Sequence, residues 1–152
     1  MKWIKSDLEQ YKQAKEYVDT IVVPLIPFQL SQDDDLEKSA FQREVLSLFS
    51  KEIEKELTGR IMLMPSYNYL KNSTKDNEVE RINEWVKDAK QQPFIHTFFI
   101  TFDSTWKKSE QAMEGTLLWF PGIQSGDLHT KEMNTMIREQ VAQIVDLIRS
   151  YW

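Results

Sequence analysis

Helical and strand patterns alternate along this chain. In four segments, apolar residues recur every three or four positions, which is the spacing of an amphipathic helix. We expect these helices in the segments 6–18, 36–57, 79–89 and 133–151. Four short apolar runs rich in β-branched and aromatic residues lie between them, and such runs are typical of buried strands. The predicted strands are TIVVPLIPF (20–28), RIMLMP (60–65), FIHTFFITF (94–102) and TLLWFP (116–121).

The alternation of strands and helices predicts an α/β fold. Such an order is typical of a parallel sheet with helices on both faces. We therefore expect a three-layer sandwich, with a mostly parallel four-stranded sheet, in a single α/β domain of residues 1–152. A short helical segment at 106–113 leaves the direction of the fourth strand open. Pro24 lies inside the first strand, which indicates either an edge strand or a bulge.

Local motifs predict several helix ends. Ser6 and Glu9 match the S-x-x-E capping box at the start of the first helix. Asp34 and Glu37 form a similar pair before the second helix. Gly59 follows that helix, where a left-handed residue commonly ends a helix.

Composition narrows the class of protein. The chain has 152 residues, of which 41% are hydrophobic, so it is long and apolar enough to fold around a core. Its net charge of −5 provides no general attraction to phosphate backbones, and we expect no nucleic-acid partner. The polar N-terminal segment is unlike a signal peptide, and no apolar run is long enough to span a bilayer. We therefore expect a cytoplasmic protein without membrane insertion.

Familiar cofactor motifs are missing from the sequence. There is no cysteine, which excludes disulfides, thiolate catalysis and cysteine-ligated metals. With four glycines, the chain contains neither a G-x-G-x-x-G nor a G-x-x-x-x-G-K-[ST] loop. It also has no H-E-x-x-H metal motif and no G-x-S-x-G nucleophile elbow. We accordingly expect no cofactor, and the sequence leaves open whether the protein is an enzyme.

Long polar segments follow the predicted strands, whereas the links from helix to strand are short. In a parallel sheet the segments after strands gather at the carboxyl ends, where α/β proteins bind ligands. If the strand order is 2-1-3-4, the chain reverses between the first and third strands, and a crevice is expected there. The candidate ligand-binding residues in these segments are Gln29, Tyr67, Asn68, Asp103, Ser104 and His129.

Each candidate also has an ordinary structural interpretation. Tyr67 and Asn68 are common in turns and packed loops. His129 is a candidate general base, with Asp127 or Asp103 to orient it, or else a loop residue near a helix start. Asp33, Asp34 and Asp35 are a weak candidate for a divalent metal site, and the main alternative is that they favour the positive end of the following helix.

Four segments resemble the YpiF-type family of Bacillus-like bacteria. They are MKWIKSDLEQYKQAKEYVDT, VVPLIP, FFITFD and LLWFPG, and the resemblance extends along the whole chain. This family is a domain of unknown function, so it provides no catalytic residues to assign. Genes of the family lie near those of a menaquinol–cytochrome c reductase. The resemblance thus implies a bacterial protein with an accessory or regulatory role linked to respiration.

Two functions remain in competition at this point. The first is a non-catalytic binding or regulatory module that acts through protein partners. The second is a small-molecule-binding protein or enzyme that uses the crevice at the carboxyl ends of the strands. Aromatic residues lie near both ends of the chain, at Trp3, Tyr151 and Trp152. They would support the binding-module hypothesis if they form an exposed docking patch, and the alternative is that they tie the chain ends to the core.

Overall fold

The computed structural model describes residues 1–123 and 126–152. Gln124 and Ser125, in the segment predicted to precede the last helix, lie outside the described residues. The α-helices are α1 (Lys5–Gln13), α2 (Leu36–Glu56), α3 (Lys75–Ala89) and α4 (Lys131–Arg149). Three 3₁₀ segments are η1 (Lys15–Tyr17), η2 (Asp33–Asp35) and η3 (Ser104–Ala112). The strands are β1 (Thr20–Phe28), β2 (Ile61–Leu63), β3 (Tyr67–Leu70), β4 (His96–Thr101) and β5 (Thr116–Trp119).

The strands form one parallel sheet in the order β2-β1-β4-β5, and β3 also pairs with β1. This is the order 2-1-3-4 of the predicted strands. The open question about the last strand is resolved, because β5 runs parallel to β4 with Phe98 opposite Thr116. The connection between these two parallel strands therefore contains η3 in place of a full crossover helix.

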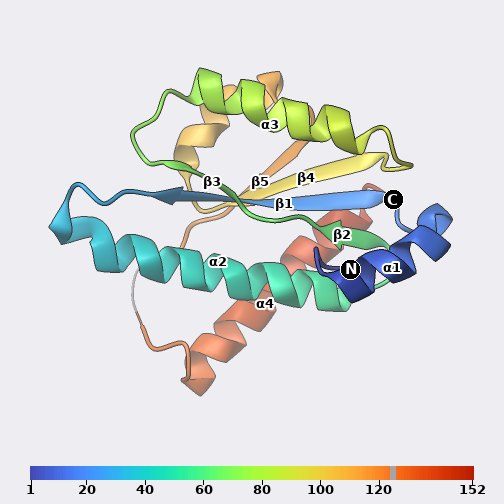
Figure 1. The fold of residues 1–152 in the computed structure, drawn as a ribbon. Coiled ribbons are helices and arrows are strands. Elements are labelled where there is room, and N and C mark those ends of the chain that lie inside the picture. The colour runs from blue at the N-terminus through green and yellow to red at the C-terminus, as the bar shows by residue number, and fades with distance from the viewer. Residues whose placement is uncertain (124–125) are drawn as a thin grey trace.

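Helices cover both faces of the sheet, as expected for a three-layer sandwich (Figure 1). α2 and α4 pack on one face, and α3, η3 and α1 pack on the other. Side chains along β1 alternate between the two cores, so Val22 contacts the α2–α4 core while Ile21 and Val23 contact the α3 core. Because β1 is buried on both faces, its sequence is a continuous apolar run.

The sheet has five strands, so the prediction of four was wrong. The segment Tyr67–Leu70, expected as part of a polar connection, is β3. Leu63 of β2 and Tyr67 of β3 are four positions apart, whereas their β1 partners, Val22 and Leu25, are three apart. One extra residue is thus inserted between β2 and β3, which is the count of a β-bulge.

The break between β2 and β3 also explains how β1 tolerates a proline at position 24. β1 lies in the middle of the sheet, so the edge position considered for Pro24 was wrong. Pro24 pairs with Ile100 of β4 and lies between Val22, the last partner of β2, and Leu25, the first partner of β3. The missing N–H of the proline falls where the neighbouring strand is interrupted, so a central strand tolerates it.

Two of the predicted helix starts were wrong. α1 begins at Lys5 after Ile4, so Ser6 lies inside the helix and the capping box does not form. α2 follows a 3₁₀ turn, and its N-cap residue Asp35 makes no side-chain cap hydrogen bond. By contrast, Gly59 has a φ of 93°, so its predicted left-handed conformation is confirmed.

The C-terminal tryptophan is tied to the body of the protein. Its indole N–H donates a 3.0 Å hydrogen bond to Oγ1 of Thr20, and the guanidinium of Arg60 lies 3.8 Å from the centre of the Trp152 ring. Trp152 also packs against the α2–α4 core. Trp3, in contrast, is 58% exposed. In the part of the chain that the structure describes, no helix combines the length and apolar character needed to cross a membrane.

Candidate functional site

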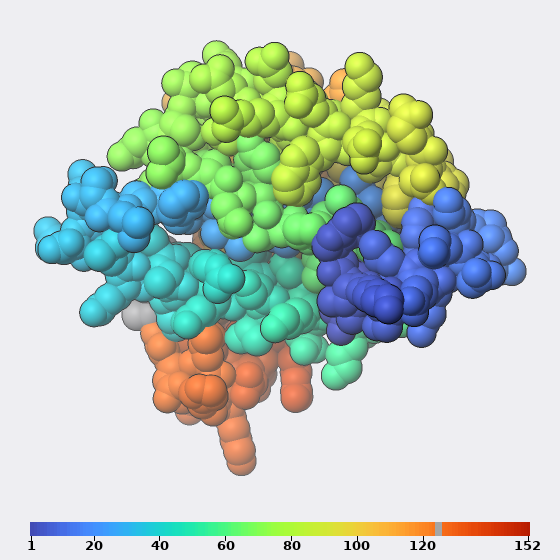
Figure 2. Space-filling model, in the orientation of Figure 1, coloured from blue at the N-terminus to red at the C-terminus, as the bar shows by residue number. Residues whose placement is uncertain are grey.

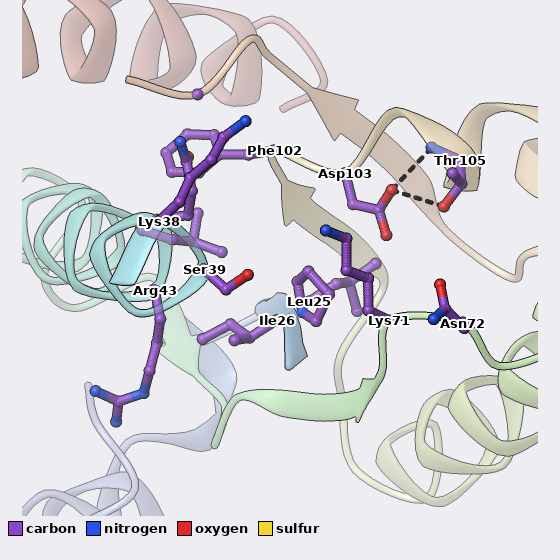
Figure 3. Close-up of a pocket in the computed structure, with 14 residues that line it drawn as sticks. Leu25, Ile26, Lys38, Ser39, Arg43, Lys71, Asn72, Phe102, Asp103 and Thr105 are labelled. Carbon is purple, nitrogen blue, oxygen red and sulfur yellow. Dashed lines mark hydrogen bonds between the residues drawn. The ribbon is translucent and has the colours of Figure 1, made fainter. Parts of the chain in front are cut away.

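A crevice of about 330 Å³ opens at the carboxyl ends of β1 and β4 (Figure 3). It lies where the order of the strands reverses, since β2 and β3 are on one side of β1 and β4 is on the other. Its walls come from the end of β1, the first three turns of α2, and the segments that follow β3, β4 and β5. The lining residues are Leu25, Ile26, Pro27, Lys38, Ser39, Gln42, Arg43, Leu46, Lys71, Asn72, Phe102, Asp103, Thr105 and Gly122.

The floor of the crevice is apolar. Leu25 and Ile26 end the buried part of β1, and Leu46 of α2 packs beside Ile26 in the same core. Pro27, near the end of β1, and Phe102, directly after β4, are partly exposed, and the Phe102 ring packs edge-on against Phe49 of α2. An apolar group of a ligand therefore has a surface against which to lose water.

The rim of the crevice is cationic. Lys38 and Arg43 project from α2, and Lys71 follows β3. In Figure 3 the Lys71 amine points into the space between α2 and Asp103, whereas the Arg43 guanidinium extends away from it. The Lys71 ammonium lies 3.5 Å from a carboxylate oxygen of Asp35.

The carboxylate on the opposite wall, Asp103, is held by four contacts. It accepts hydrogen bonds from the Tyr69 hydroxyl at 2.6 Å and from the Thr105 hydroxyl and backbone N–H at 2.6 and 3.0 Å. The Lys75 ammonium lies 3.8 Å away. Burial by itself would raise the pKa of Asp103, but the bonds from Thr105 and Tyr69 and the charge of Lys75 outweigh it and keep the pKa below its ordinary value.

Two buried tyrosines of β3 remain protonated at neutral pH. Burial raises the pKa of Tyr69, and the hydrogen bond to Asp103 raises it further. Burial also raises the pKa of Tyr67, whose hydroxyl donates a 2.5 Å bond to Glu78 of α3. Trp106 donates its indole N–H to the Tyr69 oxygen at 2.7 Å. These phenols therefore act as hydrogen-bond donors within the fold.

Of the six candidate binding residues, Asp103 lines the crevice. Ser104 is exposed beside it, outside the lining. Tyr67 points to α3, and Asn68 is exposed and accepts a 3.2 Å hydrogen bond from Ser66. Ser104, Tyr67 and Asn68 are therefore outside the lining of the crevice.

Gln29 and His129 also lie outside the lining. The Gln29 amide group bonds the backbone N–H and carbonyl of Gln32, so it shapes the turn before η2. His129 is exposed, and its backbone N–H donates a 2.9 Å bond to Asp127. The oxygens of Asp103 bond Tyr69 and Thr105, so the structure does not join Asp103 to the imidazole of His129.

The three aspartates considered for a metal form the 3₁₀ segment η2. Within residues 1–123 and 126–152, no three acidic or histidine side chains are grouped closely enough to hold a metal ion. Asp35 instead pairs with Lys71, which joins the start of α2 to the segment after β3.

Sequence reasoning missed most of the residues that line the crevice. Lys38, Arg43 and Lys71 resemble the charged residues of any solvated surface, and only the fold brings them together. The sequence did contain one usable signal for the neighbouring strand, because Tyr67 and Tyr69 alternate with Asn68 and Leu70 at the period of a half-buried strand.

Fold and site together define a parallel α/β protein with an apolar-floored, cation-rimmed crevice at the point where its strand order reverses. The family model described as "Protein of unknown function (DUF2487)" matches residues 9–152, and the chain belongs to this family. The chain is also similar to "Uncharacterized protein YpiF" of Bacillus subtilis (strain 168), with 28% identity over 155 residues that cover 100% of this chain and 98% of the relative. No solved structure matches the chain.

Proposed function

We propose that this protein is a non-catalytic binding module that holds a small ligand in the crevice and acts as a regulator. The observation that carries the proposal is the lining of the crevice, where an apolar floor meets polar and charged side chains from separate segments of the fold. Such a combination is typical of small-molecule sites, which bind through apolar contact and gain specificity from a few polar groups. An accessory role in respiration remains a prediction implied by the family resemblance.

The chemistry of Asp103 supports binding over catalysis. A general base needs a free lone pair within reach of the proton that it removes. The Asp103 oxygens already accept bonds from Tyr69 and Thr105 and face Lys75. Its lowered pKa makes it a weak base at neutral pH. The residue is thus suited to hold the crevice wall in place.

A ligand screen with a blocked variant tests this proposal. Ser39 lies on the crevice side of α2, so Ser39→Trp should fill the cavity, whereas Glu44→Trp places the same side chain on an exposed position of the same helix. A ligand at about 100 times its Kd stabilises the fold by about 2.7 kcal/mol, which raises the Tm of a protein of this size by about 5–11 °C.

We expect members of a purified metabolite collection to raise the Tm of the wild type and of Glu44→Trp but not of Ser39→Trp. NMR amide spectra of the three proteins check that each variant is folded. Equal effects on all three proteins, or no effect of any compound on the wild type, would contradict the crevice as a binding site.

A second candidate function, binding of a protein partner, is favoured by an exposed apolar patch. The edge patch consists of Phe28, Leu30 and Leu70, which are 44%, 82% and 58% exposed. Phe28 and Leu70 are direct neighbours across β1 and β3. In Figure 2 the green segment that contains β3 reaches the surface between α2 and α3. Adjacent exposed apolar side chains of this kind are typical of interaction surfaces.

Affinity capture with matched variants tests the second candidate. Leu70→Glu alters the edge patch, and Ile95→Glu alters an equally apolar position that is 73% exposed on the segment before β4. A partner that binds the edge patch should be retained by the wild type and by Ile95→Glu and lost with Leu70→Glu. Equal retention by all three proteins argues against this surface.

A further inference from the structure

We infer that the ligand of the crevice is a small organic carboxylate, whose charged group binds Lys71 and Lys38 and whose apolar part lies on Phe102 and Pro27. This inference rests on the proposed function, and it adds the chemical class of the ligand and the residues that select it.

The charge of the lining favours an anion. Lys38 and Lys71 line the crevice together with one carboxylate, Asp103, which Lys75 already neutralises in part, while the Arg43 guanidinium extends away from the cavity. The whole chain carries a net charge of −5, so the crevice has the opposite sign to the protein as a whole. A concave site lined with one sign of charge concentrates ligands of the other sign.

Lys71 is available to a ligand because its present partner is easily replaced. The side chains of Lys71 and Asp35 are 45% and 40% exposed, and their nearest charged atoms are 3.5 Å apart. Ion pairs with this exposure contribute little to stability. A carboxylate that enters the crevice can therefore take the place of Asp35 beside the ammonium without a large loss to the fold.

The remaining lining indicates an organic monoanion. Phe102 and Pro27 present partly exposed apolar surface at the base of the crevice, which an inorganic ion would leave uncovered. The acidic segment Asp33–Asp35 at the start of α2 disfavours a doubly charged phosphate at that helix. The cavity of about 330 Å³ lies at the lower end of the range for small-ligand sites.

Matched probes separate charge from shape. The test titrates the ¹⁵N-labelled protein with 4-phenylbutyrate, with 4-phenylbutanamide and with inorganic phosphate, and follows amide shifts by NMR. We expect 4-phenylbutyrate to produce saturable shifts around Lys71 and Phe102. The neutral amide should bind the same place about tenfold more weakly, because one charge-assisted contact is lost. Phosphate alone should give no saturable shift there.

Three variants test the assigned cations. Lys71→Met should weaken 4-phenylbutyrate binding about tenfold and leave the amide probe unchanged, and Lys38→Met should act in the same direction. Lys90→Met is the matched control, because Lys90 pairs with Glu114 and does not line the crevice. It should leave binding of every probe unchanged.

The outcomes distinguish this inference from the proposed function. Equal affinity for carboxylate and amide within the crevice, unaffected by Lys71→Met, would overturn the charge selection and leave a binding module for neutral ligands. Saturation by phosphate of the same signals would overturn the choice of a carboxylate. Absence of crevice shifts with 4-phenylbutyrate would overturn the inference alone if the metabolite screen finds another crevice ligand, and both proposals if it finds none.

Discussion

The hydroxyl of Tyr69 on β3 donates a 2.6 Å hydrogen bond to the carboxylate of Asp103, which follows β4. β1 lies between these two strands in the sheet, so the bond spans the central strand on the α3 side. Trp106 in turn donates to the oxygen of Tyr69. The three side chains thus form a directed series of donors that ends on the carboxylate in the crevice wall.

This relationship predicts a high cost for removing a single oxygen atom. Tyr69→Phe leaves the indole N–H of Trp106 without its acceptor, and Trp106 is fully buried. A buried donor without a partner costs about 1–3 kcal/mol. We expect the free energy of unfolding in urea to fall by about that amount. Tyr17→Phe, at a residue that is 68% exposed, should change it by less than about 0.5 kcal/mol.

The lowered pKa of Asp103 predicts how its contribution to stability depends on pH. Its pKa lies below the ordinary value of 3.8 in the folded state, so the folded protein favours the ionised form. The contribution is fully present above the unfolded pKa and is lost as the pH falls through the folded pKa.

The difference in unfolding free energy between wild type and Asp103→Asn measures this contribution, because other carboxylates cancel in the subtraction. We expect the wild type to be more stable than Asp103→Asn at pH 7, and the difference to shrink steadily below about pH 4. A difference that stays constant down to pH 2 would show that the charge of Asp103 does not stabilise the fold.

The two tryptophans near the ends of the chain should differ in their effect on stability. Trp152 packs on the α2–α4 core, donates to Thr20 and stacks on Arg60, so Trp152→Leu should cost about 2 kcal/mol. Trp3 is 58% exposed, and Trp3→Leu should cost less than about 0.5 kcal/mol. Thermal unfolding of both variants provides the comparison, and equal costs would contradict the tie at Trp152.

Close packing at Gly115, just before β5, predicts that even a methyl group is too large. A Cβ at this position would lie 2.7 Å from Cε2 of Phe99 and 2.9 Å from the carbonyl oxygen of Thr97. The carbonyl belongs to β4 and cannot turn aside, so Gly115→Ala should cost about 1–3 kcal/mol. Calorimetry should show a lowered Tm for this variant, whereas exposed Gln111→Ala in the preceding segment should leave the Tm nearly unchanged.

Much of the fold was predictable from local pattern. The β-branched run of β1 and the apolar stripes of α2 and α4 predicted elements that the structure confirms, because both cores need continuous apolar surface. β3 escaped prediction because it has only four residues, so the alternation of buried tyrosines with exposed Asn68 and Leu70 is very short. Its short length and polar neighbours gave the segment the composition of a loop.

The candidate site was harder to predict for a different reason. The position of the crevice follows from the order of strands and helices, and Asp103 from its place after β4. Lys38 and Lys71, however, are 33 positions apart and line the same crevice only because β3 pairs with β1. Charged side chains on exposed positions carry no local pattern that distinguishes a binding residue from a solvated one.

The single extra residue between β2 and β3 determines which face of the sheet the side chains of β3 occupy. In β2, odd-numbered Ile61 faces the α2–α4 core, whereas in β3 odd-numbered Tyr67 and Tyr69 face the α3 core. If the existing residues formed an uninterrupted ladder, Tyr67 would pair with Ile26 in place of Leu25, and both tyrosines would turn away from Glu78 and Asp103. A one-residue deletion in the segment 64–66 would give Leu63 and Tyr67 the three-residue spacing of Val22 and Leu25, so it would join β2 and β3 into one continuous strand and leave the tyrosines on the α3 side.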